Sequence, residues 1–98
     1  MAASLIDNQE RKRLELPLEK GLAYIEYIRA QDKIYLTHTE VPQKLEGQGI
    51  GSRIVQLALE KIEAEGLTLV PLCPFVALYL KKHPEWRRLV MKGIRIGD

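Results

Sequence analysis

The chain has 98 residues, of which 46% are hydrophobic and 29% are charged, and its formal net charge is +2. These values fit one globular domain over residues 1–98 and exclude a disordered, collagen-like or disulfide-rich protein. The single cysteine forms no internal disulfide, and no apolar run is long enough for a signal peptide or a membrane span, so we expect a cytoplasmic protein. The short, scattered basic groups favour a solubilising surface over a nucleic-acid interface.

The first half of the chain predicts an antiparallel meander of three strands. Leucines recur at alternate positions over residues 13–18, as in a half-buried strand. Residues 22–30 are rich in aromatic and β-branched side chains, and residues 34–41 form a third strand that ends at a proline. Lys20-Gly21 and Gln31-Asp32-Lys33 supply the turns between these strands.

The second half changes to a helical period. Hydrophobic residues recur at helical spacing from Gly49 onward, and Gly66 stands where a C-cap glycine is expected. An apolar strand over residues 67–72 and a helix from Pro74 to His83-Pro84 follow, with a short strand expected around residues 89–91. The fold class is therefore α/β (α+β): a mixed sheet in which the meander is followed by α-β-α, with strands 34–41 and 67–72 parallel.

The most informative segment is a glycine cluster between the third strand and the first helix. Gly47, Gly49 and Gly51 can adopt positive φ and let a ligand approach the backbone. The amides that follow would point out of the first helical turn, where the helix dipole favours an anion such as pyrophosphate. A tight turn without a ligand explains the spacing equally well. The residues of a P-loop and of a dinucleotide fingerprint are absent.

The run from Glu46 to Gly51 resembles motif A of the GNAT superfamily of acetyl-CoA-dependent N-acetyltransferases, Arg/Gln-x-x-Gly-x-Gly/Ala. Together with residues 37–42, 71–75 and 83–84, it makes the stretch 36–86 look like a small single-domain branch of that superfamily, with a truncated acyl-CoA N-acyltransferase fold. Glu46 departs from the pattern, which usually has Arg or Gln there. A carboxylate beside a pyrophosphate weakens binding unless it points away.

The resemblance implies acetyl-CoA as co-substrate and an amine as acceptor. Because the two histidines and the one cysteine are spread widely along the chain, we expect no metal. The main chain around Glu40 and Val41 would polarise the acetyl carbonyl and pair with the pantetheine amides. Pro42 and Pro71 would limit strand pairing where the pantetheine enters, although simple strand termination explains Pro42 equally well. The implied cofactor contacts are Glu40, Val41, Gly47, Gln48, Gly49, Ile50, Gly51 and Ser52.

Four side chains are candidates for the chemistry. His38 and Glu40 share one face of a strand and are the nearest candidates for a general base. Tyr79 matches the position of a general acid in the second helix of many relatives. Cys73 precedes that helix, whose dipole stabilises a thiolate, and would either relay a proton or take the acetyl group itself. Each of these side chains also has a structural alternative. His38 would be a strand histidine hydrogen-bonded to a neighbour, Tyr79 would pack the helix on the sheet, and Cys73 would be a small buried residue.

Three functions remain open. The first is an acetyltransferase whose open acceptor groove admits a lysine or an N-terminus of a protein, since the chain is too short for the extra elements of larger relatives. We expect it to act as a monomer or a weak homodimer, away from membranes. The second is a non-catalytic acetyl-CoA- or CoA-binding protein or sensor. The third is an interaction module, for instance on nucleic acid, whose binding would weaken steeply with salt.

Overall fold

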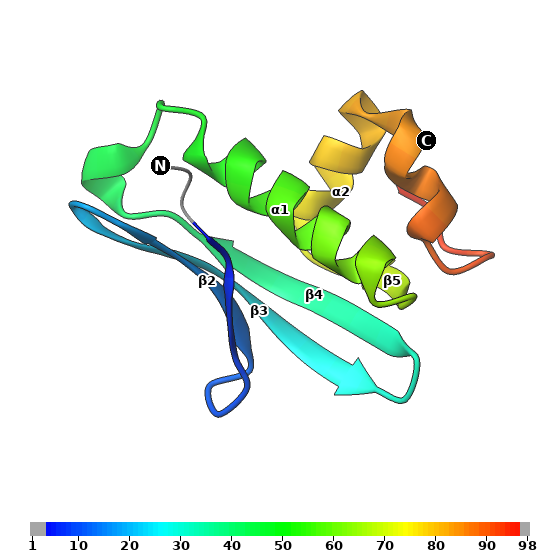
Figure 1. Ribbon diagram of the computed structural model, residues 1–98. Coiled ribbons are helices and arrows are strands. Elements are labelled where there is room, and N and C mark those ends of the chain that lie inside the picture. Colours follow the sequence, from blue (N-terminus) through cyan, green and yellow to red (C-terminus); the bar gives the residue numbers. More distant parts are fainter. Residues whose placement is uncertain (1–3, 97–98) are drawn as a thin grey trace.

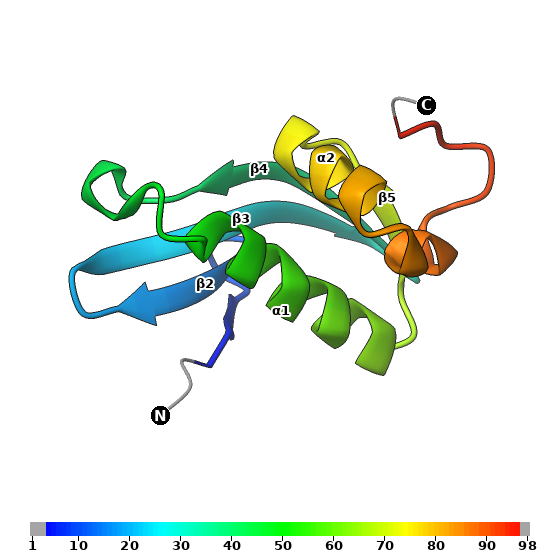
Figure 2. The ribbon, with the colours of Figure 1, turned by 90° about the horizontal axis from the view of Figure 1, so that it is seen from above.

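Residues 4–96, which the computed structural model describes, form one five-stranded sheet with two α-helices packed on the same side of it (Figures 1 and 2). The strands lie in chain order across the sheet. They are β1 (Ile6–Asn8), β2 (Arg13–Leu18), β3 (Gly21–Ala30), β4 (Lys33–Glu40) and β5 (Thr68–Pro71). β1 to β4 pair antiparallel and β4 pairs parallel with β5, so the predicted mixed sheet is confirmed, with β1 as an additional edge strand.

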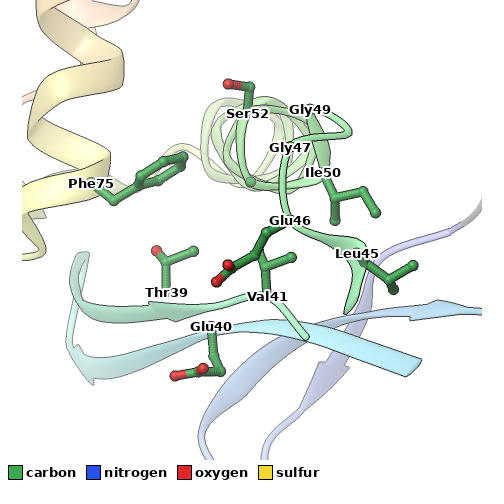
Figure 3. A pocket seen from close by; sticks show the side chains of 11 residues that line it. Thr39, Glu40, Val41, Leu45, Glu46, Gly47, Gly49, Ile50, Ser52 and Phe75 are labelled. Carbon is green, nitrogen blue, oxygen red and sulfur yellow. The ribbon is translucent and has the colours of Figure 1, made fainter. Parts of the chain in front are cut away.

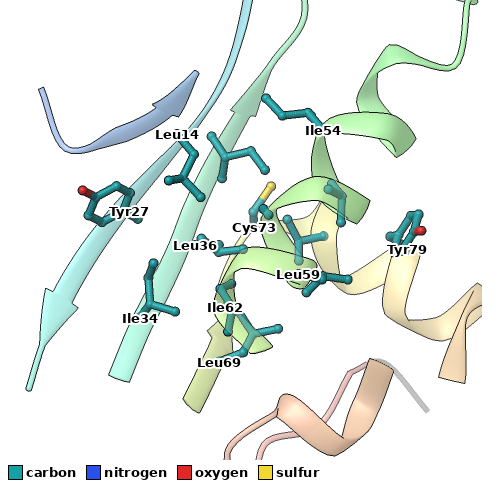
Figure 4. Packing of buried hydrophobic residues seen from close by; sticks show 14 of the residues in the cluster. Leu14, Tyr27, Ile34, Leu36, Ile54, Leu59, Ile62, Leu69, Cys73 and Tyr79 are labelled. Atoms are coloured by element: carbon teal, nitrogen blue, oxygen red, sulfur yellow. The ribbon is translucent and has the colours of Figure 1, made fainter. Parts of the chain in front are cut away.

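The core lies between the sheet and α1 (Ile50–Ala64), which crosses from β4 to β5. The alternating leucines of β2, Leu14 and Leu16, are both buried in this core, as their spacing predicts. Figure 4 shows Leu14 among the core side chains. The helix buries one stripe of side chains against the strands. Burial of each large aliphatic side chain stabilises the fold by about 1.5–3 kcal/mol. This stripe is Ile54, Val55, Ala58, Leu59 and Ile62.

α1 ends at the glycine that the sequence marks. Gly66 has φ +68°. Its N–H donates to Glu63 O at 3.1 Å, and the N–H of Leu67 donates to Ile62 O at 3.0 Å. These two bonds form a Schellman motif, which satisfies carbonyls that the helix end would otherwise leave free. The chain then turns directly into β5.

α2 (Pro74–Lys82) begins with a proline in its first turn, as predicted, and ends at His83. Pro84 opens a 3-10 helix, Pro84–Leu89, because it has no N–H with which to continue α2. The strand expected around residues 89–91 is wrong in extent. It is reduced to one parallel bridge between Leu69 and Val90, supported by the Met91 N–H to Leu69 O bond of 2.9 Å. No helix within residues 4–96 is long and apolar enough to cross a membrane.

Candidate functional site

A pocket of about 410 Å³ opens where the end of β4, the glycine loop and the first turns of α1 and α2 meet (Figure 3). Of the cofactor contacts that the family resemblance implies, Gln48 alone does not line this pocket. Thr39, Leu45, Glu46 and Phe75 complete the wall, and sequence reasoning assigned no ligand contact to them. The full lining is Thr39, Glu40, Val41, Leu45, Glu46, Gly47, Gly49, Ile50, Gly51, Ser52 and Phe75.

The three glycines of the loop have different structural roles. Gly47 and Gly49 have φ +82° and +77°, and a Cβ atom on either would meet nothing within 4 Å. Their backbone conformation, rather than crowding, requires glycine. A Cβ atom on Gly51 would instead lie 2.7 Å from Cζ of Phe75. Gly51 therefore lets α2 pack against the first turn of α1, which the glycine spacing alone did not indicate.

The first turn of α1 presents backbone donors to the pocket. Gly49 is the N-cap residue, makes no side-chain cap hydrogen bond, and is followed by a first turn without an acidic residue. The first intrahelical bond runs from the Arg53 N–H to Gly49 O at 3.0 Å. The N–H groups of Ile50, Gly51 and Ser52 precede it and have no carbonyl partner within the helix. Three uncapped donors at a helix N-terminus suit an anionic ligand.

The sheet opens at the same place. Pairing between β4 and β5 ends at Leu36 opposite Pro71. Beyond it, the N–H groups of Leu72 and Cys73 both donate to Leu36 O, at 3.0 and 2.9 Å, and turn the chain into α2. β4 continues to Glu40 with pairing to β3 alone. Over residues 37–40, the edge of β4 that faces β5 therefore has no strand partner in the part of the chain that the structure describes.

A β-bulge decides which side chains of β4 face the pocket. Leu36 lies opposite Tyr27 and His38 opposite Glu26, so Thr37 is an extra residue without a partner in β3. An extra residue exchanges the two faces for every side chain that follows. Thr39 and Val41 consequently point into the pocket, whereas the side chain of Glu40 points away from it (Figure 3).

His38 and Glu40 form a pair on the open face of the sheet. His38 Nε2 lies 2.8 Å from Glu40 Oε1, and both side chains are about half exposed. Their predicted common orientation is confirmed. Because a carboxylate only accepts hydrogen bonds, this contact assigns the proton to Nε2 in the neutral ring and leaves Nδ1 as an acceptor. Glu40 thus contributes its main chain to the pocket and its carboxylate to the opposite face.

Cys73 lies just behind the pocket wall. It is the N-cap residue of α2, as the sequence indicates, and is buried. Its Sγ is 3.4 Å from Oγ1 of Thr39, a residue that does line the pocket. Thiol and hydroxyl thus face each other across the gap between β4 and the start of α2. Sequence reasoning missed Thr39 because only the bulge turns it inward.

Tyr79 lies outside the main pocket. Its ring stacks on that of His83 with centroids 4.2 Å apart, and both line a smaller hollow between α1 and α2. Burial is the main reason that the pKa of Tyr79 is raised above its ordinary value, and the charges of Glu85 and Glu60 add to it. The phenol therefore keeps its proton at neutral pH. Its role as a general acid stays a prediction.

Glu46 is exposed at the entrance of the pocket, and its side chain points from the loop toward β4 (Figure 3). A carboxylate in this position opposes the binding of a pyrophosphate by charge repulsion, unless the side chain turns toward solvent. The exposure of Glu46 leaves room for such a turn.

The sheet, the glycine turn and the opening beside β4 define a domain of the acyltransferase type. Residues 13–89 match the family described as GCN5-related N-acetyl-transferase, and the chain belongs to this family. It is also 25% identical over 89 residues to Protein NATD1 of Xenopus tropicalis, an alignment that covers 85% of this chain and 81% of that protein.

Proposed function

We propose that this protein is an N-acetyltransferase that binds acetyl-CoA in the 410 Å³ pocket and transfers the acetyl group to an amine arriving at the open face of the sheet. The observation that carries the proposal is the position of an uncapped helix N-terminus directly beside the unpaired edge of β4. The first feature suits a pyrophosphate and the second suits an amide-bearing chain. Membership of the GCN5-related family supports the same chemistry.

The residues present fit the coenzyme at both ends of the pocket. The N–H groups of Ile50, Gly51 and Ser52 would hold the pyrophosphate, since nothing on their own helix bonds them. The main chain of Thr39 to Val41 offers hydrogen-bonding groups on an edge without a strand partner, where the pantetheine amides would pair. Bound acetyl-CoA supplies a thioester, whose acetyl carbon is open to attack by a nitrogen.

Transfer joins the amine nitrogen to the acetyl carbon and breaks the carbon–sulfur bond. One proton must leave the nitrogen and one must reach the sulfur. We assign the first to His38, whose Nδ1 is a free acceptor while Nε2–H bonds to Glu40. Glu40 holds the imidazole and stabilises the charge it gains. The half-exposed pair suits an amine carried by a protein lysine or N-terminus.

Thr39 and Cys73 are the groups nearest to the gap on the pocket side. Their hydroxyl and thiol can relay a proton toward the leaving sulfur. In a two-step variant, Sγ of Cys73 bonds to the acetyl carbon and its proton goes to the departing thiolate. The amine nitrogen then bonds to the acetyl carbon, the bond from that carbon to Sγ of Cys73 breaks, and the proton from the nitrogen returns to Sγ. The two routes differ in one observable: with acetyl-CoA and no amine, only the second gives a protein that is heavier by one acetyl group.

The second candidate is a CoA-binding protein without turnover, which the burial of Cys73 favours, because a buried thiol is a poor nucleophile. It shares the pocket with the first and lacks only the chemistry. Turnover with a lysine peptide therefore separates the two, provided that binding is measured on the same sample.

The test of the proposal is a calorimetric titration with acetyl-CoA and CoA, repeated on Ser52→Glu and Ser52→Gln. A carboxylate in the first turn stabilises a helix, so Ser52→Glu keeps the fold while it repels the pyrophosphate. We expect saturable binding by the native protein, near-complete loss in Ser52→Glu, and little change in the neutral Ser52→Gln. Equal affinity in all three proteins, or no binding by the native one, would contradict the proposal.

A further inference from the structure

We infer that the small hollow between α1 and α2 binds the 3′-phosphate of the coenzyme's adenosine, with Lys82 as its main ligand. This inference rests on the proposed function and deepens it, because it states how the protein distinguishes CoA from ligands that lack this phosphate. The hollow measures about 50 Å³, a size that suits a phosphate group rather than a purine ring. Its lining is Ser52, Phe75, Leu78, Tyr79, Lys82 and His83.

The hollow adjoins the main pocket. Ser52 and Phe75 line both. Ser52 is in the first turn of α1, where the pyrophosphate is expected, so a ligand that continues past this residue and away from β4 enters the hollow. The pantetheine occupies the other direction along β4. The adenosine end of the same molecule would therefore lie on the side of the pocket that faces α2.

The charge of the hollow suits a phosphate monoester. No aspartate or glutamate lines it, whereas Lys82 and His83 do. Lys82 forms no salt bridge within residues 4–96, in contrast to Lys61 on α1, whose Nζ lies 2.5 Å from Glu65 Oε2. His83 is less available, since its Nδ1 lies 3.9 Å from Glu85 Oε2. Lys82 is therefore the cation that an incoming phosphate would pair with first.

Exposed apolar side chains line the hollow together with Lys82. Phe75 and Leu78 are 40% and 48% exposed and stand one turn apart on α2, on the side that leads to Lys82. The Phe75 ring is fixed by its contact with Gly51. Large apolar groups exposed beside a polar groove mark a ligand surface, and a purine has the flat face that an aromatic ring stacks on. The ribose joins the pyrophosphate, the base and the 3′-phosphate, and these three groups would meet the first turn of α1, the Phe75 ring and Lys82, respectively.

A second concavity borders the main pocket on its other side and is the competing position. It shares Leu45 and Ile50 with the pocket and contains the cations Lys20 and Lys44. It also contains Glu19, which opposes a dianion, and has no aromatic side chain. The hollow at Lys82 is the better match, because no carboxylate lines it and two aromatic side chains, Phe75 and Tyr79, do.

The experiment compares CoA with 3′-dephospho-CoA, which differs from it only by the 3′-phosphate, by calorimetry at one ionic strength. We expect the native protein to bind CoA about tenfold more tightly, since an amine–phosphate contact is a strong charge-assisted bond. Lys82→Gln should reduce CoA affinity to that of 3′-dephospho-CoA and leave the latter unchanged. Lys81→Gln is the matched control, because Lys81 is the adjacent exposed residue of α2 and does not line the hollow.

The possible outcomes separate this inference from the proposed function. Equal affinities for the two ligands in the native protein would overturn the phosphate site and leave acetyl-CoA binding intact. A preference that survives Lys82→Gln and disappears in Lys44→Gln would also overturn it, in favour of the competing concavity. Binding of neither ligand would overturn the proposed function together with the site.

Discussion

His38 and Glu40 show how much a single extra residue in a strand can decide. Without Thr37 as the bulged residue, the two side chains would continue the inward face of Ile34 and Leu36. With it, they lie on the open face as a hydrogen-bonded pair, and Thr39 takes the inward position beside Cys73. The candidate base and the candidate thiol are thus kept on opposite faces of one strand. An acceptor and a coenzyme can reach the same gap without competing for space.

His38→Asn should lower the rate of acetyl transfer to a lysine peptide by about 100-fold, since a positioned general base contributes roughly 10²–10⁴-fold. The affinity for acetyl-CoA should stay the same, because His38 lies on the face away from the pocket. Initial rates at saturating acetyl-CoA, together with a titration of the same sample, give both quantities.

Glu10→Gln is the control for this prediction, since Glu10 is an exposed residue of the turn between β1 and β2 and does not line the pocket. Unchanged turnover in His38→Asn would assign the base elsewhere. A parallel loss of acetyl-CoA affinity would mean that the substitution disturbs β4 rather than the chemistry.

At the scale of elements, the packing of the N-terminus of α1 against the N-terminus of α2 depends on Gly51 and Phe75. The ring of Phe75 occupies the space that a Cβ atom on Gly51 would need, so the two residues act as one unit. α1 would otherwise prefer alanine at this position by about 1 kcal/mol. Glycine at position 51 allows α2 to lie close to α1. This close packing places Phe75 in the wall of both the main pocket and the hollow at Lys82.

Gly51→Ala should therefore destabilise the protein by about 1–3 kcal/mol, the usual effect of overpacking. In a Phe75→Ala background the same substitution should become neutral or stabilising, because the clash is gone and the helix propensity of alanine remains. Urea unfolding of the native protein, the two single variants and the double variant gives the coupling free energy between Gly51 and Phe75. Gly49→Ala is the control: its cost arises from positive φ, so Phe75→Ala should not relieve it.

Periodicity made the long elements of this fold predictable. The leucines of β2 and the helical stripe of α1 repeat often enough to specify which face is buried, and Gly66 and Pro74 specify helix ends through their own backbone limits. The bulge at Thr37 was not predictable, because the residues from Ile34 to Glu40 read as an unbroken strand and only pairing with β3 reveals the extra residue. The sequence therefore indicates where the candidate site lies, but it does not indicate that Thr39, rather than Glu40, points into the pocket.

At the scale of the whole molecule, β1 is an edge strand held by long-range contacts. Its three residues, Ile6–Asn8, carry no alternation that a sequence pattern could detect. Beyond its pairing with β2, it is attached to β3 by the hydroxyl of Tyr27, which donates to Oδ1 of Asp7. Such a contact joins residues far apart in the chain, so local sequence cannot indicate it. It closes the side of the sheet away from the candidate site.

This bond gives the fold a pH dependence at alkaline pH. Burial, followed by the hydrogen bond and the charge of Asp7, raises the pKa of Tyr27 well above the value of about 10 for a free phenol. The folded state therefore holds its phenolic proton more tightly than the unfolded state does. The resulting stability is fully present below pH 10 or so and is lost as the pH rises from there toward the folded-state pKa. Between about pH 10 and pH 12, the free energy of unfolding should consequently fall more steeply in the native protein than in Tyr27→Phe.

Urea titrations at a series of pH values over that range measure the two slopes. Tyr35→Phe serves as the matched control, since Tyr35 is a half-buried tyrosine of β4 and makes no hydrogen bond through its hydroxyl within residues 4–96. Its slope should equal that of the native protein. At neutral pH, Tyr27→Phe should cost about 1 kcal/mol, the typical net contribution of one hydrogen bond. Parallel slopes in Tyr27→Phe and the native protein would mean that the β1–β3 contact does not hold its proton in solution, and that β1 is attached by its pairing with β2 alone.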